Sequence, residues 1–163
     1  MNFSRIAAVS VIACAALTAA ACEKEAPDAA KKNLSEGLND LVAKNKAGFI
    51  AQVVPSQRKS FKLAESMQIG DKTYSTMPMD KLLDIKMFST IKSYKYDKST
   101  LKSDNKAEVL TVLTFEDGAF ATLFFKMDKL AQGDWKINMK ETVDWHRKVH
   151  GSFAFTAVKL KKR

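Results

Sequence analysis

The sequence predicts an α+β domain in which N-terminal helices pack on a curved antiparallel sheet, in a cone-like or cystatin-like arrangement. Two features predict this fold: apolar residues recur at helical spacing after Pro27, and they alternate with polar residues from Ile91 onward. The 163 residues are 46% hydrophobic and 28% charged, which is typical of a globular domain. This composition excludes a disordered polyelectrolyte and a multi-span membrane protein.

The helical part is predicted to begin at Asp28, which has the right type for an N-cap. Leu34, Leu38, Leu41 and Val42 follow at i, i+4, i+7 and i+8, which is the spacing of one apolar helix face. We therefore expect a first helix of about four turns.

Further helices are expected before the strands begin. A second, shorter helix is predicted around residues 49–54, ended by Pro55, and a third over residues 56–70. The run Met77-Pro78-Met79-Asp80 interrupts the pattern before another helical stretch through Met87.

The period changes to two after Ile91. Two runs each place four side chains on one strand face: Val109, Thr111, Leu113 and Phe115, then Ala121, Leu123, Phe125 and Met127. Asp117-Gly118 between these runs supplies the positive φ angles of a tight hairpin. The next turn is predicted at Gln132-Gly133-Asp134. A further strand face is shared by Trp135, Ile137 and Met139, and residues 152–160 can add a last strand.

This element order, the Gly118 hairpin and the ending Asp134-Trp135-Lys136-Ile137 resemble the small bacterial envelope lipoproteins of unknown function with a ketosteroid isomerase/SnoaL-like, or nuclear-transport-factor-like, cone domain. The resemblance covers roughly residues 28–141, and the region after Glu141 is additional. It implies a conical cavity between sheet and helices, which is catalytic in some relatives and only a binding pocket in many. Fold alone does not decide between these roles.

A lipoprotein signal peptide is predicted over residues 1–21. Arg5 is followed by an uncharged apolar stretch that ends in small residues directly before Cys22. This ending resembles a bacterial lipobox, which implies cleavage before Cys22 and a diacylglyceryl group on its sulfur. Val11-Ile12-Ala13-Cys14 also fits the pattern, but cleavage there would leave apolar residues 15–21 exposed at the new N-terminus.

We therefore expect residues 22–27 to tether one domain, residues 28–163, to a membrane of the cell envelope, on its periplasmic side. Glu23 stands where the family's inner-membrane retention signal is an aspartate, which favours the outer membrane slightly. Both cysteines of the chain, Cys14 and Cys22, precede the domain, so no disulfide stabilises it.

A catalyst in such a cone needs an ionisable group on the inward sheet face, where burial tunes its pKa. The acidic residues of the strand region stand instead at strand ends and turns: Glu108, Glu116, Asp117, Asp128, Asp134 and Glu141. We read them as surface charges and expect a non-catalytic binding or interaction module that requires no cofactor. A small enzyme using the cone pocket is the alternative.

A second alternative is a periplasmic metal-handling protein. His146 and His150 are spaced i, i+4, and Asp144 could join them as a zinc ligand. Met77 and Met79 could bind Cu(I) through their thioethers. Apolar packing of the methionines and an exposed polar helix explain these residues equally well, so we expect no metal site.

The formal net charge of +9 is unevenly distributed, because no acidic residue follows Trp145. The basic residues of this end form a predicted surface for anionic lipid, an envelope polymer or an acidic protein: Arg147, Lys148, Lys159, Lys161, Lys162 and Arg163. A solubilising end is the other interpretation. A second basic group, on the predicted third helix, consists of Arg58, Lys59 and Lys62. We do not expect nucleic acid as a partner of either group, because an exported protein does not meet it.

Overall fold

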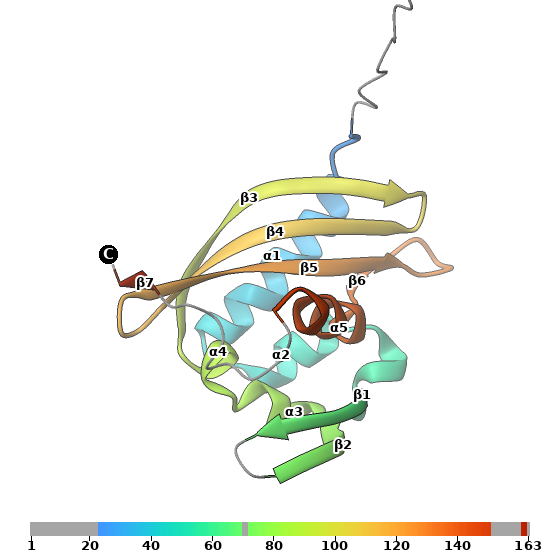
Figure 1. Cartoon of the computed structure of the whole chain (residues 1–163). Coiled ribbons are helices and arrows are strands. Elements are labelled where there is room, and N and C mark those ends of the chain that lie inside the picture. The colour runs from blue at the N-terminus through green and yellow to red at the C-terminus, as the bar shows by residue number, and fades with distance from the viewer. Residues whose placement is uncertain (1–22, 70–71, 151–160, 163) are drawn as a thin grey trace, which may run out of the picture.

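The computed structural model describes residues 23–69, 72–150 and 161–162 (Figure 1). The helices are α1 (Asp28–Val42), α2 (Lys46–Ala51), the short 3-10 helix η1 (Pro55–Gln57), α3 (Met79–Leu83), α4 (Lys86–Ser89) and α5 (Met139–His150). The strands are β1 (Ser60–Ile69), β2 (Lys72–Pro78), β3 (Ile91–Ser103), β4 (Lys106–Phe115), β5 (Ala119–Lys129), β6 (Trp135–Ile137) and β7 (Lys161–Lys162).

The main sheet is antiparallel, with the order β3-β4-β5-β6, and β7 pairs with the other end of β5. Its long strands curve across the molecule with α1 behind them, while the β1–β2 hairpin lies at the end of the molecule away from β3 (Figure 1). The predicted fold class, helices packed on a curved antiparallel sheet, is thereby confirmed.

Alternation on β4 and β5 separates the two faces of this sheet. The inward face is buried and carries Ala107, Val109, Thr111, Leu113, Phe115, Ala119, Ala121, Leu123, Phe125 and Met127. It shares one core with Leu34 and Leu38 of α1 and Phe49 of α2, all of which are 0% exposed. Burial of these apolar side chains is the main source of stability in a domain without disulfides.

Two tyrosines of β3 attach α1 to the sheet. The Tyr94 hydroxyl donates to the Ser35 carbonyl at 3.2 Å, and the Tyr96 hydroxyl lies 2.6 Å from the Ser35 hydroxyl. The apolar stripe predicted for α1 is buried, but Pro27, not Asp28, occupies the N-cap position. Asp28 is the first helical residue, where its carboxylate pairs with Lys31 and faces the positive end of the helix dipole.

The helix predicted over residues 56–70 is wrong. Residues 60–69 form β1, because antiparallel pairing with β2 satisfies the backbone of both segments and overrides the helical spacing of the apolar residues. The basic group predicted on that helix is therefore dispersed over different elements. Arg58 follows η1 and donates hydrogen bonds to the carbonyls of Val53 and Ala51.

The two turns lie where they were predicted, with positive φ angles of 77° at Gly118 and 97° at Gly133. Asp117 does not have the positive φ that was predicted for it, and the Gly118 backbone N–H donates to the Phe115 carbonyl at 2.9 Å. The strand predicted through Met139 is too long, because β6 ends at Ile137 and Met139 begins α5. The Thr142 hydroxyl accepts a hydrogen bond from the backbone N–H of Lys126 at 2.9 Å and donates to the Asn138 carbonyl at 2.8 Å. Helix α5 therefore closes the edge of β5 where β6 has ended.

The predicted last strand, residues 152–160, lies outside the described residues. β7 begins directly after it, and Lys161 and Lys162 pair with Phe120 and Ala119 of β5.

Residues 23–27 lie along β3, at the edge of the sheet that β4 does not occupy. The Leu101 backbone N–H donates to the Lys24 carbonyl at 2.6 Å, and Glu23 pairs with Lys98 at 2.5 Å. Ala26 is only 3% exposed. The segment predicted to be a tether is thus held against the domain from its first described residue.

Candidate functional site

Catalysis in such a cone was predicted to require an ionisable side chain on the inward face of the sheet. At the inward positions of β4 and β5, every side chain is apolar except Thr111, whose hydroxyl lies 3.5 Å from the Val109 carbonyl. These two strands therefore present no carboxylate, imidazole or amine to the core, so they supply no acid or base for catalysis there.

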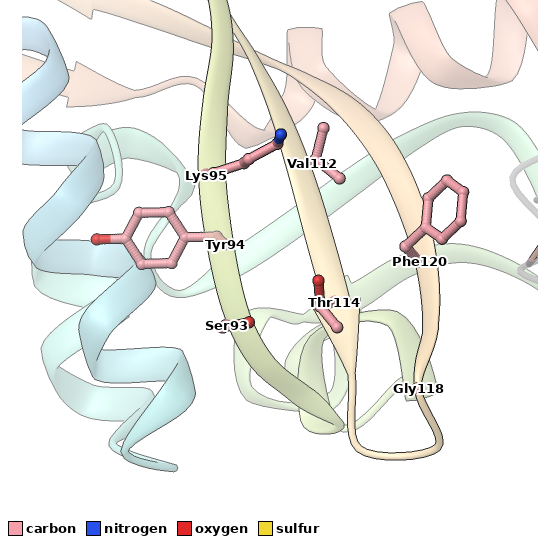
Figure 2. Close-up of a pocket in the computed structure, with 7 residues that line it drawn as sticks. All are labelled: Ser93, Tyr94, Lys95, Val112, Thr114, Gly118 and Phe120. Atoms are coloured by element: carbon pink, nitrogen blue, oxygen red, sulfur yellow. The ribbon is translucent and has the colours of Figure 1, made fainter. Parts of the chain in front are cut away.

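A pocket of about 450 Å³ lies on the opposite, outward face of the sheet (Figure 2). Three adjacent strands build it, and its lining residues are Ser93, Tyr94, Lys95, Val112, Thr114, Gly118 and Phe120. Ser93 pairs with Thr114, Lys95 with Val112, and Thr114 with Phe120, so paired side chains project from the same face.

The side chains of this pocket differ in kind. Val112 and Phe120 are half-buried apolar walls, whereas Lys95 is exposed. Tyr94 points away toward α1, as Figure 2 shows. An added Cβ at Gly118 would meet nothing within 4 Å, so the turn leaves its end of the pocket open.

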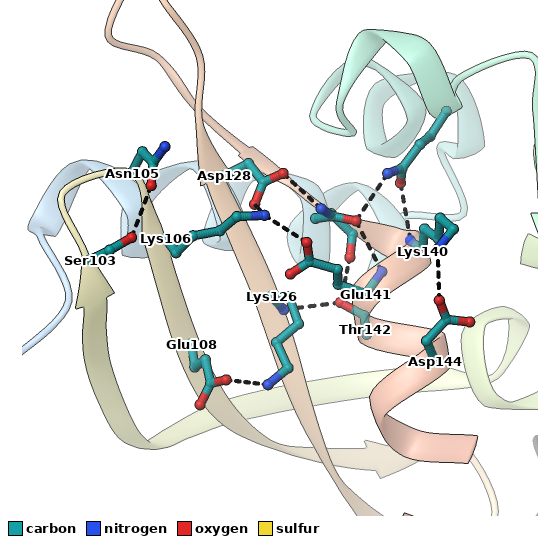
Figure 3. Close-up of polar contacts among 12 residues, drawn as sticks. Ser103, Asn105, Lys106, Glu108, Lys126, Asp128, Lys140, Glu141, Thr142 and Asp144 are labelled. Atoms are coloured by element: carbon teal, nitrogen blue, oxygen red, sulfur yellow. Dashed lines mark hydrogen bonds and ion pairs between the residues drawn. The ribbon is translucent and has the colours of Figure 1, made fainter. Parts of the chain in front are cut away.

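The other end of the outward face carries a network of ion pairs (Figure 3). Lys106 lies between two carboxylates, 2.7 Å from Asp128 and 2.6 Å from Glu141. Burial acts to lower the pKa of Lys106, but hydrogen bonds to Asp128 and Glu141 outweigh it, and the pKa is raised. The lysine is therefore a fixed cation that links β4, β5 and α5.

Lys126 is the most enclosed charge of this face, with 8% of its surface exposed. Its amine pairs with Glu108 and lies 5.2 Å from the centre of the Trp145 ring. Trp145 also packs edge-on against Phe124, with 4.6 Å between ring centres. This arrangement attaches α5 to the sheet and leaves the charge of Lys126 compensated.

Most of the acidic residues predicted to be surface charges take part in ion pairs. Beyond those in the network, Glu116 pairs with Lys44 at 2.8 Å and Asp117 with Lys86 at 3.1 Å. These carboxylates therefore form ion pairs that join neighbouring elements at the surface. Asp134 lines a second groove instead, between α1 and the turn before β6.

That second groove has a volume of about 390 Å³ and mixed charge. Lys32 and Lys136 face Glu36 and Asp134 around it, so the charges of its lining balance. Lys136 also donates to Gln52 at 3.0 Å. The balanced charges of this lining favour neither a cation nor an anion as a ligand.

The residues considered for metal binding are dispersed. Within residues 23–69, 72–150 and 161–162, no three His, Cys, Asp or Glu side chains gather as a metal site requires. His146 is 2% exposed on α5, Asp144 pairs with Lys140 at 3.0 Å, and Met79 is buried in the core. The side chains of His150 and Met77 are not among those described.

The predicted basic surface divides between two elements. Arg147 and Lys148 are on α5, and Lys161 and Lys162 form β7, where Lys161 is in register with the pocket residue Phe120. Lys159, Arg163 and the predicted lipidation site Cys22 lie outside the described residues. The described part of the chain holds no helix long and apolar enough to cross a membrane.

Lys95, like Ser93, Val112, Thr114 and Phe120, was not predicted from the sequence to be a site residue. The alternation of residues on β3 could have predicted the face on which Lys95 lies, because it separates Ser93 and Lys95 from Tyr94 and Tyr96. The pairing of Lys95 with Val112 could not be read from the chain, because it depends on the register between β3 and β4.

No family model and no curated protein matches the chain. Among solved structures, a ketosteroid isomerase-like protein from Erwinia carotovora atroseptica SCRI1043 is similar, with 17% identity and a TM-score of 0.45 over 68% of this chain and 88% of that one. An NTF-2-like protein of unknown function from Shewanella oneidensis MR-1 has 12% identity and a TM-score of 0.43 over 68% of this chain and 93% of its own. Neither likeness bears on the activity of this chain.

Proposed function

We propose that this chain is a lipid-anchored protein of the cell envelope, exposed to the periplasm, that acts as a non-catalytic binding module. The lipobox-like ending before Cys22 carries the anchoring part of this proposal, and the contacts of residues 23–27 bear on where such an anchor would begin. Five contacts fix this segment: those of Glu23 with Lys98 and Lys102, of Glu25 with Lys31 and Ser99, and of the Lys24 carbonyl with Leu101.

An anchor at Cys22 would begin next to the folded domain. Consecutive Cα atoms are about 3.8 Å apart, so an acyl group on Cys22 would begin within a few ångströms of Glu23. Because Glu23 is paired with Lys98, the edge of β3 would lie at the membrane surface without a flexible spacer.

The binding part of the proposal is supported by the two sheet faces. The inward positions of β4 and β5 hold no ionisable side chain, while the outward face has a pocket with polar and apolar walls. Small-molecule sites are commonly clefts of about 300–1,000 Å³ with a few polar groups among apolar ones. The outward pocket fits this description.

The anchor is tested by the mass of the N-terminal peptide of the protein extracted from its own membrane. The expected peptide begins at Cys22 and carries the mass of the acyl groups. Cys22→Ala should abolish this modification, and Cys14→Ala serves as the matched control that should not. An unmodified N-terminus, or acyl groups on Cys14, would refute the anchor at Cys22.

Separation of the two membranes tests the location, for which we propose the outer membrane. Native mass spectrometry of the gently extracted protein tests the binding role, because it weighs any molecule that stays bound. Turnover of a bound small molecule by the purified chain would contradict the non-catalytic assignment.

A further inference from the structure

We infer that the outward pocket of β3, β4 and β5 binds a small organic anion, in which a carboxylate or phosphate is attached to an apolar group. This inference deepens the proposed binding role and names its ligand class. It does not depend on the lipid anchor.

Lys95 supplies the positive charge. Among the described residues it makes no ion pair, and none of the residues that line the pocket is acidic. The lysines of the neighbouring outward surface differ, because Lys98 is paired with Glu23 and Lys126 with Glu108. An uncompensated ammonium beside a hollow attracts an anion.

The hydroxyl groups of the pocket can complete the contact to an anion. Ser93 and Thr114 are a cross-strand pair on the same face as Lys95, and each hydroxyl is able to donate a hydrogen bond. Figure 2 shows the Thr114 and Lys95 side chains along neighbouring strands at one side of the pocket. A carboxylate or phosphate has enough acceptor oxygens for all three groups.

Val112 and Phe120 supply the apolar part. Both are half-buried, and they lie on adjacent strands with Thr114 paired to Phe120. A short alkyl or aryl group placed against them would remove apolar surface from water, which favours binding by about 25 cal/mol for each Å². A purely inorganic anion would leave this wall unused.

The two-residue strand β7 borders the pocket. Lys161 of β7 is in register with Phe120, so the backbone of the C-terminal lysine pair runs beside the pocket. The second groove has no excess of positive charge, because Lys32 and Lys136 are balanced there by Glu36 and Asp134. Lys95, which has no acidic residue beside it in the pocket lining, therefore makes the outward pocket the anion site.

The test uses the full chain as it is extracted from its membrane in a neutral detergent, titrated with hexanoate and followed by the amide resonances of each residue. Hexanol and hexylamine have the same alkyl chain without the negative charge. We expect hexanoate to shift the amides of Ser93, Val112, Thr114 and Phe120 in a saturable way, and to bind at least about 10-fold more tightly than either control.

Lys95→Gln should weaken hexanoate binding by about 10-fold, and Lys95→Arg should retain it. Lys92→Gln is the matched control, because Lys92 is also an exposed lysine of β3 but does not line the pocket. Equal binding of hexanol, unchanged binding by Lys95→Gln, or shifts confined to other residues would overturn the inference. Failure of this test leaves the Cys22 anchor intact, and an unmodified Cys22 leaves this site intact.

Discussion

Replacing Thr142 by valine tests how α5 is attached to the sheet. The Thr142 side chain is 0% exposed, and its hydroxyl joins the backbone N–H of Lys126 to the Asn138 carbonyl. Valine has nearly the same shape but can neither donate nor accept a hydrogen bond. The substitution therefore removes two hydrogen bonds and leaves the packing volume almost unchanged.

The size of the effect follows from which groups lose their partners. The Asn138 carbonyl still accepts from the backbone N–H of Thr142 at 3.0 Å, so only the N–H of Lys126 is left unsatisfied in a buried position. An unsatisfied buried donor costs about 1–3 kcal/mol, and the second lost bond adds about 1 kcal/mol. We expect Thr142→Val to lower the free energy of unfolding by about 2–4 kcal/mol.

Urea unfolding followed by tryptophan fluorescence measures this change as a shift of the midpoint at constant slope. Faster amide exchange at Lys126 is the local readout. Thr142→Ser is the matched control, because it keeps the hydroxyl and loses only a methyl group, worth about 1 kcal/mol. A valine variant as stable as the wild type, or a serine variant equally destabilised, would refute the reasoning.

Four other perturbations test the core, the hairpin and two ionisable groups. Phe125→Ala empties a fully buried position and should lower the free energy of unfolding by about 3–5 kcal/mol in the same urea assay, whereas a loss below about 1 kcal/mol would mean that the core is loosely packed there. Gly118→Ala should cost about 1–2 kcal/mol through its φ of 77° alone, since no atom obstructs the new methyl group, and an unchanged midpoint would contradict that turn geometry. Burial raises the pKa of Tyr96 to about 12, so stability that is complete below the ordinary pKa of about 10 should fall as the pH rises toward 12, and Tyr96→Phe should flatten this fall in urea midpoints. Hydrogen bonding and charge from Lys98 lower the pKa of Glu23, so the attachment of residues 23–27 should weaken as the pH falls below about 4.5, and Glu23→Gln should speed amide exchange at Leu101 at neutral pH.

The elements of this domain differ in how far the sequence alone predicts them. The inward faces of β4 and β5 and the Gly118 and Gly133 turns were predicted, because side-chain alternation and positive φ are properties of short segments. β1 was missed because its apolar residues also fit a helix, and only pairing with β2 decides between the two. The start of α5 at Met139 was missed for a similar reason, since its attachment depends on Thr142 and the edge of β5.

The sequence by itself determined the fold class, the apolar stripe of α1, and the concentration of basic residues after Trp145, because these depend on the order of residue types. It also carries the whole case for a signal peptide and for Cys22 as a lipid anchor. The tertiary structure alone decided that residues 23–27 lie against β3, and that Lys95, Val112 and Phe120 share one pocket. Those contacts join residues far apart in the chain, so they depend on strand register and on which sheet edge remains free, and neither is a property of any single segment.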